Sequence, residues 1–131
     1  MVFRYFKDED GAGIIGLGTT QPKAFEETAL AMFNLVTDIK KIKPKTRIEL
    51  ECSAEDDEEL LYEWLTEILR EAVVNEMIFS RVKITSMKNM RIKGWAKGDV
   101  YKKDIDVEPT YEKVEIGKKG QKFFAKCIIR C

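Results

Sequence analysis

The feature that most constrains the fold is a segment between Gly18 and Leu69 in which two amphipathic helices flank one short strand. In the first helix, apolar residues recur at helical spacing: Phe25, Ala29, Met32, Phe33 and Val36. In the second helix the apolar face is wider: Leu60, Leu61, Trp64, Leu65, Ile68, Leu69 and Ala72. Because each apolar face must be buried against another element, both helices need a sheet to pack on.

The ends of the two helices carry recognisable signals. Thr20 is expected to cap the first helix, and Pro22 suits its first turn, where a missing N–H costs nothing. Ser53 is expected to cap the second helix, and the acidic run at 55–59 lies at the positive end of the helix dipole.

The remaining segments are predicted to form strands. Between the helices, residues 47–52 alternate strictly between polar and apolar, which is typical of a half-buried strand in an antiparallel sheet. Further strands are predicted at 3–6, 14–17, 77–85, 90–96, 111–116 and 123–131, with a hairpin turn at 117–122 and a charged irregular connection at 99–110. We favour a core position for Trp95. This order predicts one α+β domain over residues 1–131, with two helices packed on antiparallel sheets.

Composition argues against several classes of function. The chain has 23 basic and 23 acidic residues, and this balance predicts no strong direct binding of nucleic acid. No apolar stretch of about 18 residues and no signal-peptide core are present, so we expect no membrane contact and a cytoplasmic location. The lack of histidine excludes Ser-His-Asp and Cys-His catalysis. Three cysteines without a CxxC pair make a disulfide framework or a zinc site a poor fit.

Carboxylates are the remaining candidates for chemistry. Asp8, Glu9 and Asp10 occupy the expected turn between the first two strands. Oxygen ligands on a bend suit a hard cation such as Ca²⁺ or Mg²⁺, especially when another segment adds a carboxylate, and we take Asp8, Asp10 and Glu112 as candidate ligands. An acidic surface turn with no metal is the alternative. An enzyme that uses paired carboxylates as acid and base is a further alternative.

Several segments follow the order and spacing of one known family. They are the helix pattern at 24–33 (AFEETALAMF), the second helix pattern at 60–69 (LLYEWLTEIL), Phe79 and Ser80 with Val82 and Ile84, Gly98 and Asp99 with Tyr101, and Thr110 with Tyr111. In these segments the chain resembles the archeases, which are small α+β proteins. The resemblance covers nearly the whole chain.

The resemblance implies a function through a protein partner. Archeases assist the tRNA-splicing RNA ligase by promoting its guanylylation and its multiple turnover, and a chaperone role toward a tRNA-modifying methyltransferase is also proposed for the family. We therefore expect an accessory protein that is not itself an enzyme. Its expected partner is an RNA ligase or another tRNA-processing enzyme.

The resemblance also implies a small acidic metal site, and this sequence departs from it. The family site uses an N-terminal aspartate, a late lysine and an aspartate next to the C-terminus. Counting from the shared motifs places Gly11, Val107 and Arg130 at these positions. A shift of one residue in the turn would restore Asp10, but it would also reverse the direction of every side chain in the strand.

Two explanations stay open. In the first, the site has moved and is regrouped from Asp10, Glu112 and Asp106, with a divalent cation bound. In the second, the chain is a paralogue that has lost the metal site and acts as a chaperone-like module or binds a small ligand. Arg130 would then pair with Asp10 or Glu112 where the metal would lie. The grouping of the substitutions at one site favours the second.

Overall fold

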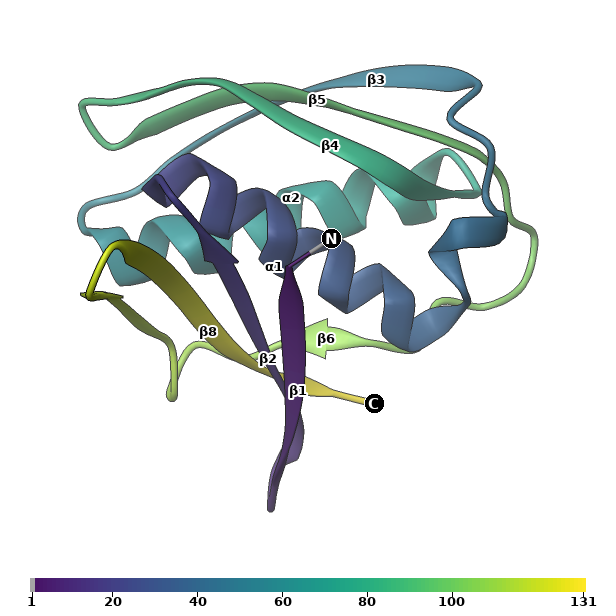
Figure 1. The fold of residues 1–131 in the computed structure, drawn as a ribbon. Helices are drawn as coiled ribbons and strands as arrows, with labels where there is room; N and C mark the ends of the chain where they lie inside the picture. The colour runs from purple at the N-terminus through teal and green to yellow at the C-terminus, as the bar shows by residue number, and fades with distance from the viewer. Residues whose placement is uncertain (1) are drawn as a thin grey trace.

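Two antiparallel sheets enclose a layer of two helices, α1 (Gln21–Val36) and α2 (Asp57–Val74), in the computed structural model, which describes residues 2–131 (Figure 1). The upper sheet has the strand order β3-β5-β4, formed by β3 (Thr46–Ser53), β4 (Met77–Lys88) and β5 (Arg91–Val100). The lower sheet has the order β1-β2-β8-β6, with β7 also paired to β8. Its strands are β1 (Phe3–Asp8), β2 (Gly11–Gly18), β6 (Glu108–Pro109), β7 (Glu115–Lys119) and β8 (Lys122–Arg130). The predicted α+β arrangement is confirmed.

Helix α1 is the centre of the core. The sequence predicts one buried face, but almost every residue from Ala24 to Phe33 is buried, because the lower sheet covers one side of the helix and β4 covers another. The predicted cap is confirmed: the Thr20 hydroxyl accepts a hydrogen bond from the Lys23 N–H at 3.2 Å, and Pro22 lies in the first turn. A one-turn 3₁₀ helix, Ile39–Lys41, follows α1 before the chain enters β3.

Three hydrogen bonds join the layers through α1. Trp64 of α2 donates its indole N–H to the Phe25 carbonyl at 3.2 Å, and both side chains are fully buried. The Thr28 hydroxyl lies 3.1 Å from the Ala125 carbonyl of β8. The third bond runs from the Ile84 N–H of β4 to the carboxylate of Glu26 at 2.8 Å. Since buried polar groups need partners, these three bonds set how α1 lies against its neighbours.

The predicted starts of α2 and β7 are wrong, and several strands run two or three residues further than predicted. The cap of α2 is Asp56 and not Ser53, because Ser53 still pairs with Arg91 in the sheet and the chain needs three more residues to turn into the helix. The Asp56 carboxylate accepts a hydrogen bond from the Glu59 N–H at 2.9 Å. The strand predicted at 111–116 begins only at Glu115, since residues 111–113 form a turn.

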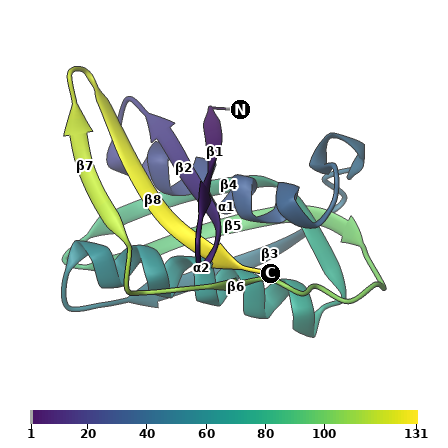
Figure 2. The same ribbon diagram turned by 90° about the horizontal axis from the view of Figure 1, so that it is seen from below.

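The late part of the chain differs from prediction in two further places. The connection predicted as irregular at 99–110 contains the short strand β6, which pairs with the end of β8. The predicted core position of Trp95 is also wrong. Trp95 lies opposite Glu49 and Lys83 on the outer face of the upper sheet, while its neighbours Gly94 and Ala96 face the helices. Figure 2 views the molecule from the side of the lower sheet and shows β7 extending that sheet beyond β8.

Candidate functional site

The acidic turn, residues 8–10, joins β1 to β2. Asp8 is the last residue of β1 and Gly11 the first of β2, so only Glu9 and Asp10 lie between the two strands. Gly11 has a φ of 153°, and a Cβ atom there would collide with the carbonyl oxygen of Ile129 in β8. Only glycine allows this close approach, which brings the turn against the C-terminal end of β8.

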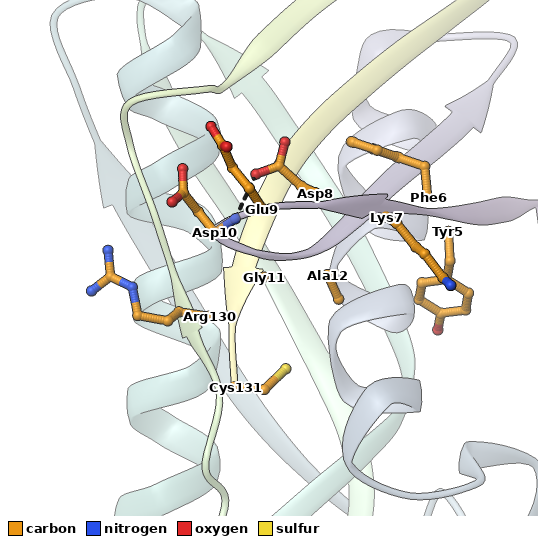
Figure 3. A pocket seen from close by; sticks show the side chains of 10 residues that line it. All are labelled: Tyr5, Phe6, Lys7, Asp8, Glu9, Asp10, Gly11, Ala12, Arg130 and Cys131. Atoms are coloured by element: carbon orange, nitrogen blue, oxygen red, sulfur yellow. Dashed lines mark hydrogen bonds between the residues drawn. The ribbon is translucent and has the colours of Figure 1, made fainter.

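The acidic turn borders a shallow depression of about 690 Å³ that Arg130 and Cys131 also line (Figure 3). The depression is open to solvent. Tyr5, Phe6 and Lys7 of β1 and Gly11 and Ala12 of β2 also line it. It is therefore a surface feature suited to contact with another molecule and is not an enclosed pocket.

One lysine neutralises much of the acidic turn. The Lys113 ammonium lies 3.1 Å from an Asp8 oxygen, 3.0 Å from an Asp10 oxygen and 3.7 Å from a Glu9 oxygen. The Asp10 N–H also donates to the Asp8 carboxylate at 3.0 Å. This N–H and the Lys113 ammonium both lower the pKa of Asp8, with the N–H as the larger cause. Hydrogen bonds to Asp10 and Asp8 raise the pKa of Lys113.

The structure brings together some of the predicted site residues and not others. Asp8 and Asp10 share the acidic turn, as predicted from their spacing. Glu112 is exposed and does not line the depression. Asp106 lies in a different depression, of about 330 Å³, beside the end of α2. Val107 is partly buried and packs against the core. The set of Asp8, Asp10 and Glu112 is therefore not assembled around one point.

The expected ion pair of Arg130 with Asp10 or Glu112 is also absent among residues 2–131. Arg130 instead pairs with Glu108 at 3.8 Å, because these two residues are register partners in the β6–β8 ladder. The cation on the acidic turn comes from Lys113, which sequence reasoning missed. The one feature of the sequence that could have indicated Lys113 is its position next to Glu112 in a segment predicted to be a strand. Side chains alternate along a strand, so the two residues would have been placed on opposite faces.

The acidic turn in this conformation does not fit a divalent cation. Within the described part of the chain, no three His, Cys, Asp or Glu side chains are arranged to hold one metal ion. The Asp8 and Asp10 oxygens that would bind a cation already contact the Lys113 ammonium, and an ammonium close to a metal ion would repel it. Bound Ca²⁺ or Mg²⁺ stays a prediction that requires Lys113 to move away.

A second surface lies on the outer face of the lower sheet. Ile15, Leu17 and Phe124 are partly exposed there and line a depression of about 410 Å³ that has basic side chains around it. Lys126 is one of these basic residues, and its ammonium lies 4.9 Å from the ring centroid of Phe6. Apolar side chains with a charged rim are typical of protein–protein interfaces.

Cys127, which is buried, and Cys52, which is partly buried, are poor nucleophiles. Burial raises the pKa of the Cys127 thiol to about 11 and that of the Cys52 thiol to about 12. Both thiols are therefore protonated at neutral pH, and only the thiolate reacts readily. No helix in residues 2–131 has the length and hydropathy needed to cross a membrane.

Comparisons with known proteins agree with this architecture. The sequence model of the Archease protein family matches residues 3–129. Protein archease of Sulfolobus acidocaldarius is 35% identical over 100 residues, which cover 76% of this chain and 72% of that protein. The solution structure of a Methanobacterium thermoautotrophicum protein matches with a TM-score of 0.77 and 28% identity, over 98% of both chains.

A more distant match shows the same fold. The crystal structure of an archease and possible chaperone from Thermotoga maritima matches with a TM-score of 0.62 and 13% identity, over 96% of this chain and 94% of that chain. The match of the family model to nearly the whole chain is decisive, since it spans both sheets and both helices. The chain belongs to the archease family.

Proposed function

We propose that this archease is an accessory protein of an RNA ligase in tRNA processing, and that it promotes guanylylation and turnover of the ligase through protein–protein contact. The observation that carries the proposal is the match to the family model over residues 3–129. The family motifs at 24–33 and 60–69 supply the central helix packing, so the element that holds the family fold together is kept. We expect the protein to act in the cytoplasm.

The acidic turn is the part of the surface that we assign to the ligase. It stands at the tip of the β1–β2 hairpin, which extends below the lower sheet in Figure 1. Asp10 is exposed there and Lys113 is partly exposed, so both charges are accessible to a partner. The apolar and basic face of the lower sheet is continuous with β1 and β2, and offers the apolar contact that a specific complex needs.

Guanylylation of the host's RNA ligase by labelled GTP tests the proposal. With the archease present, the ligase should be labelled faster and through repeated turnovers, and the archease alone with GTP should give no labelled protein. The double substitution Asp8→Asn and Asp10→Asn should remove most of the stimulation. The matched control, Asp104→Asn and Asp106→Asn, deletes the same charge from the separate depression beside α2 and should keep it. Equal labelling with and without archease would refute the accessory role.

A second candidate function is a chaperone-like module that lacks the metal site. The observation that favours it is Lys113, which contacts the carboxylates that a metal would need. Calorimetric titration with Ca²⁺ distinguishes the two candidate functions. Saturable binding that is lost in Asp10→Ala would support a metal-dependent accessory protein. If neither the wild type nor Lys113→Met binds Ca²⁺ while the wild type still protects a tRNA-processing partner from thermal aggregation, the module would be supported.

A further inference from the structure

The outer face of the upper sheet is strongly basic. Strand alternation points Leu50, Ile92 and Val82 toward the helices, so the residues between them point outward. Over 47–53 of β3, 81–88 of β4 and 91–97 of β5, the outward positions hold seven basic and two acidic side chains. This face is the top of the molecule in Figure 1, with both helices below it. A chain with zero net charge therefore concentrates positive charge on one sheet.

The acids on this face lie at one edge and neutralise few of the cations. Both belong to β3: Glu49 pairs with Arg47 at 2.6 Å, and Glu51 pairs with Arg91 at 3.6 Å. Beyond this area, Asp99 near the end of β5 is paired with Lys45 at 3.7 Å. The other five cations form no ion pair with any residue from 2 to 131; they are Arg81, Lys83, Lys88, Lys93 and Lys97.

An aromatic ring lies in the middle of the basic face. Trp95 is on the central strand β5, between Glu49 on β3 and Lys83 on β4, and it is partly exposed. The Arg47 guanidinium and the Lys97 ammonium each lie 5.0 Å from its ring centroid. A tryptophan flanked by cations offers a π surface to an unpaired base and positive charge to the neighbouring phosphates.

The positive surface continues to the β4–β5 hairpin. A depression of about 600 Å³ there is lined by Ser86, Lys88, Asn89, Arg91 and Lys93, with no acidic side chain among them. Asn89 and Met90 both have a φ of 55°, which fits a tight two-residue turn that keeps the strands paired up to Lys88 and Arg91. The cations therefore form a continuous track along β4 and β5, with Trp95 beside it.

We infer that this face binds single-stranded RNA, with the phosphates along the β4 and β5 cations and one base stacked on Trp95. An acidic protein is a poorer fit, because protein interfaces need a core of apolar side chains and the only large aromatic or aliphatic group that this area presents outward is Trp95. An RNA duplex is also a poorer fit, since its bases are not free to stack on a side chain. The site lies on the opposite side of the helix layer from the surface that we assign to the ligase.

Fluorescence anisotropy with a labelled 12-nucleotide oligouridine tests the inference on the full chain without any ligase. At about 50 mM salt the wild type should bind saturably, and Lys83→Ala with Lys93→Ala should raise Kd about tenfold. The slope of log affinity against log salt should fall by about 1.4, because about 0.7 is lost for each single-strand phosphate contact. The matched control, Lys118→Ala with Lys119→Ala, deletes two exposed charges from β7 in the other sheet and should change Kd less than about twofold.

Substitutions of Trp95 distinguish binding of RNA from binding of any polyanion. Trp95→Ala should raise Kd about fivefold or more, whereas Trp95→Phe should keep most of the affinity, since a phenyl ring still stacks on a base. The salt slope should be unchanged in both, because no phosphate contact is lost. If the β7 control weakens binding as much as the sheet variant, or if polyglutamate of equal charge competes as well as RNA and Trp95→Ala has no effect, the inference is overturned. Circular dichroism confirms that each variant is folded.

Discussion

Replacing Glu26 with methionine tests how the central helix is fixed to the upper sheet. The Glu26 side chain is only 4% exposed, and its carboxylate accepts the Ile84 N–H at 2.8 Å. Ile84 lies where the β4–β5 register shifts, so this N–H is satisfied by the helix side chain. Lys23, whose side chain is 54% exposed, pairs with the other carboxylate oxygen at 3.3 Å.

The expected loss of stability depends on which hydrogen-bonding group each substitution leaves without a partner. Methionine has a similar volume but only a weak thioether acceptor, so the buried N–H of Ile84 loses its carboxylate partner, and we expect a loss of about 2–3 kcal/mol in the free energy of unfolding. Glutamine keeps an acceptor oxygen, so Glu26→Gln should lose about 1 kcal/mol. Lys23→Ala removes only an exposed ion pair and should lose less than about 0.5 kcal/mol. A typical domain is stable by about 5–15 kcal/mol, so the first effect is large.

Urea unfolding at pH 7, followed by circular dichroism and linear extrapolation, measures these differences. Replacement of a buried charge by an apolar group can stabilise a protein when no partner is left unsatisfied. Glu26→Met should have the opposite effect and lower the stability, because the backbone N–H of Ile84 remains without its partner. If Glu26→Met is as stable as Glu26→Gln, or more stable than the wild type, the hydrogen bond does not hold the helix to the sheet in the way argued.

Three further predictions concern single groups. Lys113→Met should raise the pKa of Asp8 part of the way to its ordinary 3.8, measured by carboxyl NMR. Because folding lowers this pKa, the stability that Asp8 adds is present above pH 3.8 and lost as pH falls through the folded value, so the thermal stability of the two proteins should converge in acid. In the native protein iodoacetamide should label Cys131, which is exposed, well before Cys127, whose pKa burial raises to about 11; equal labelling rates in mass spectrometry would contradict this. Trp64→Phe should lose about 1–3 kcal/mol in urea unfolding, since the Phe25 carbonyl inside α1 loses the indole as a second donor and the smaller ring leaves a cavity; a loss below about 0.5 kcal/mol would argue against that bond.

The helices and their packing could be predicted because periodicity is a local signal with one physical outcome. The apolar face of α2 contains Trp64 and Leu65, and both are fully buried. The burial of α1 on its remaining sides was harder to predict. It depends on small or uncharged residues such as Ala24, Thr28 and Ala31, which tolerate either solvent or a close sheet. Only the presence of a second sheet makes them core residues.

The candidate site depends on contacts between segments far apart in the sequence, which local patterns do not predict. Asp8 and Asp10 could be placed together because two residues separate the paired strands. The third partner depended on a contact over more than 100 residues along the chain, and on where β7 begins. Since residues 111–113 are a turn, strand alternation does not apply to them, and Lys113 rather than Glu112 reaches the acidic turn. Predicting that partner requires the register of β6 and β7 against β8.

The two proposed surfaces predict variants that separate two steps of RNA ligation. When the ligase is labelled by GTP in the absence of RNA, Lys83→Ala with Lys93→Ala should leave the stimulated labelling unchanged. If the upper sheet holds single-stranded RNA close to the ligase, the same variant should raise the RNA concentration needed for half-maximal ligation about tenfold at low salt, and the difference should shrink as salt rises. Asp8→Asn with Asp10→Asn should show the reverse, with weak labelling of the ligase and unchanged affinity for oligouridine. A variant of the upper sheet that loses both activities in proportion would mean that the two faces serve one interface, because surfaces on opposite sides of the helix layer should otherwise be additive and independent.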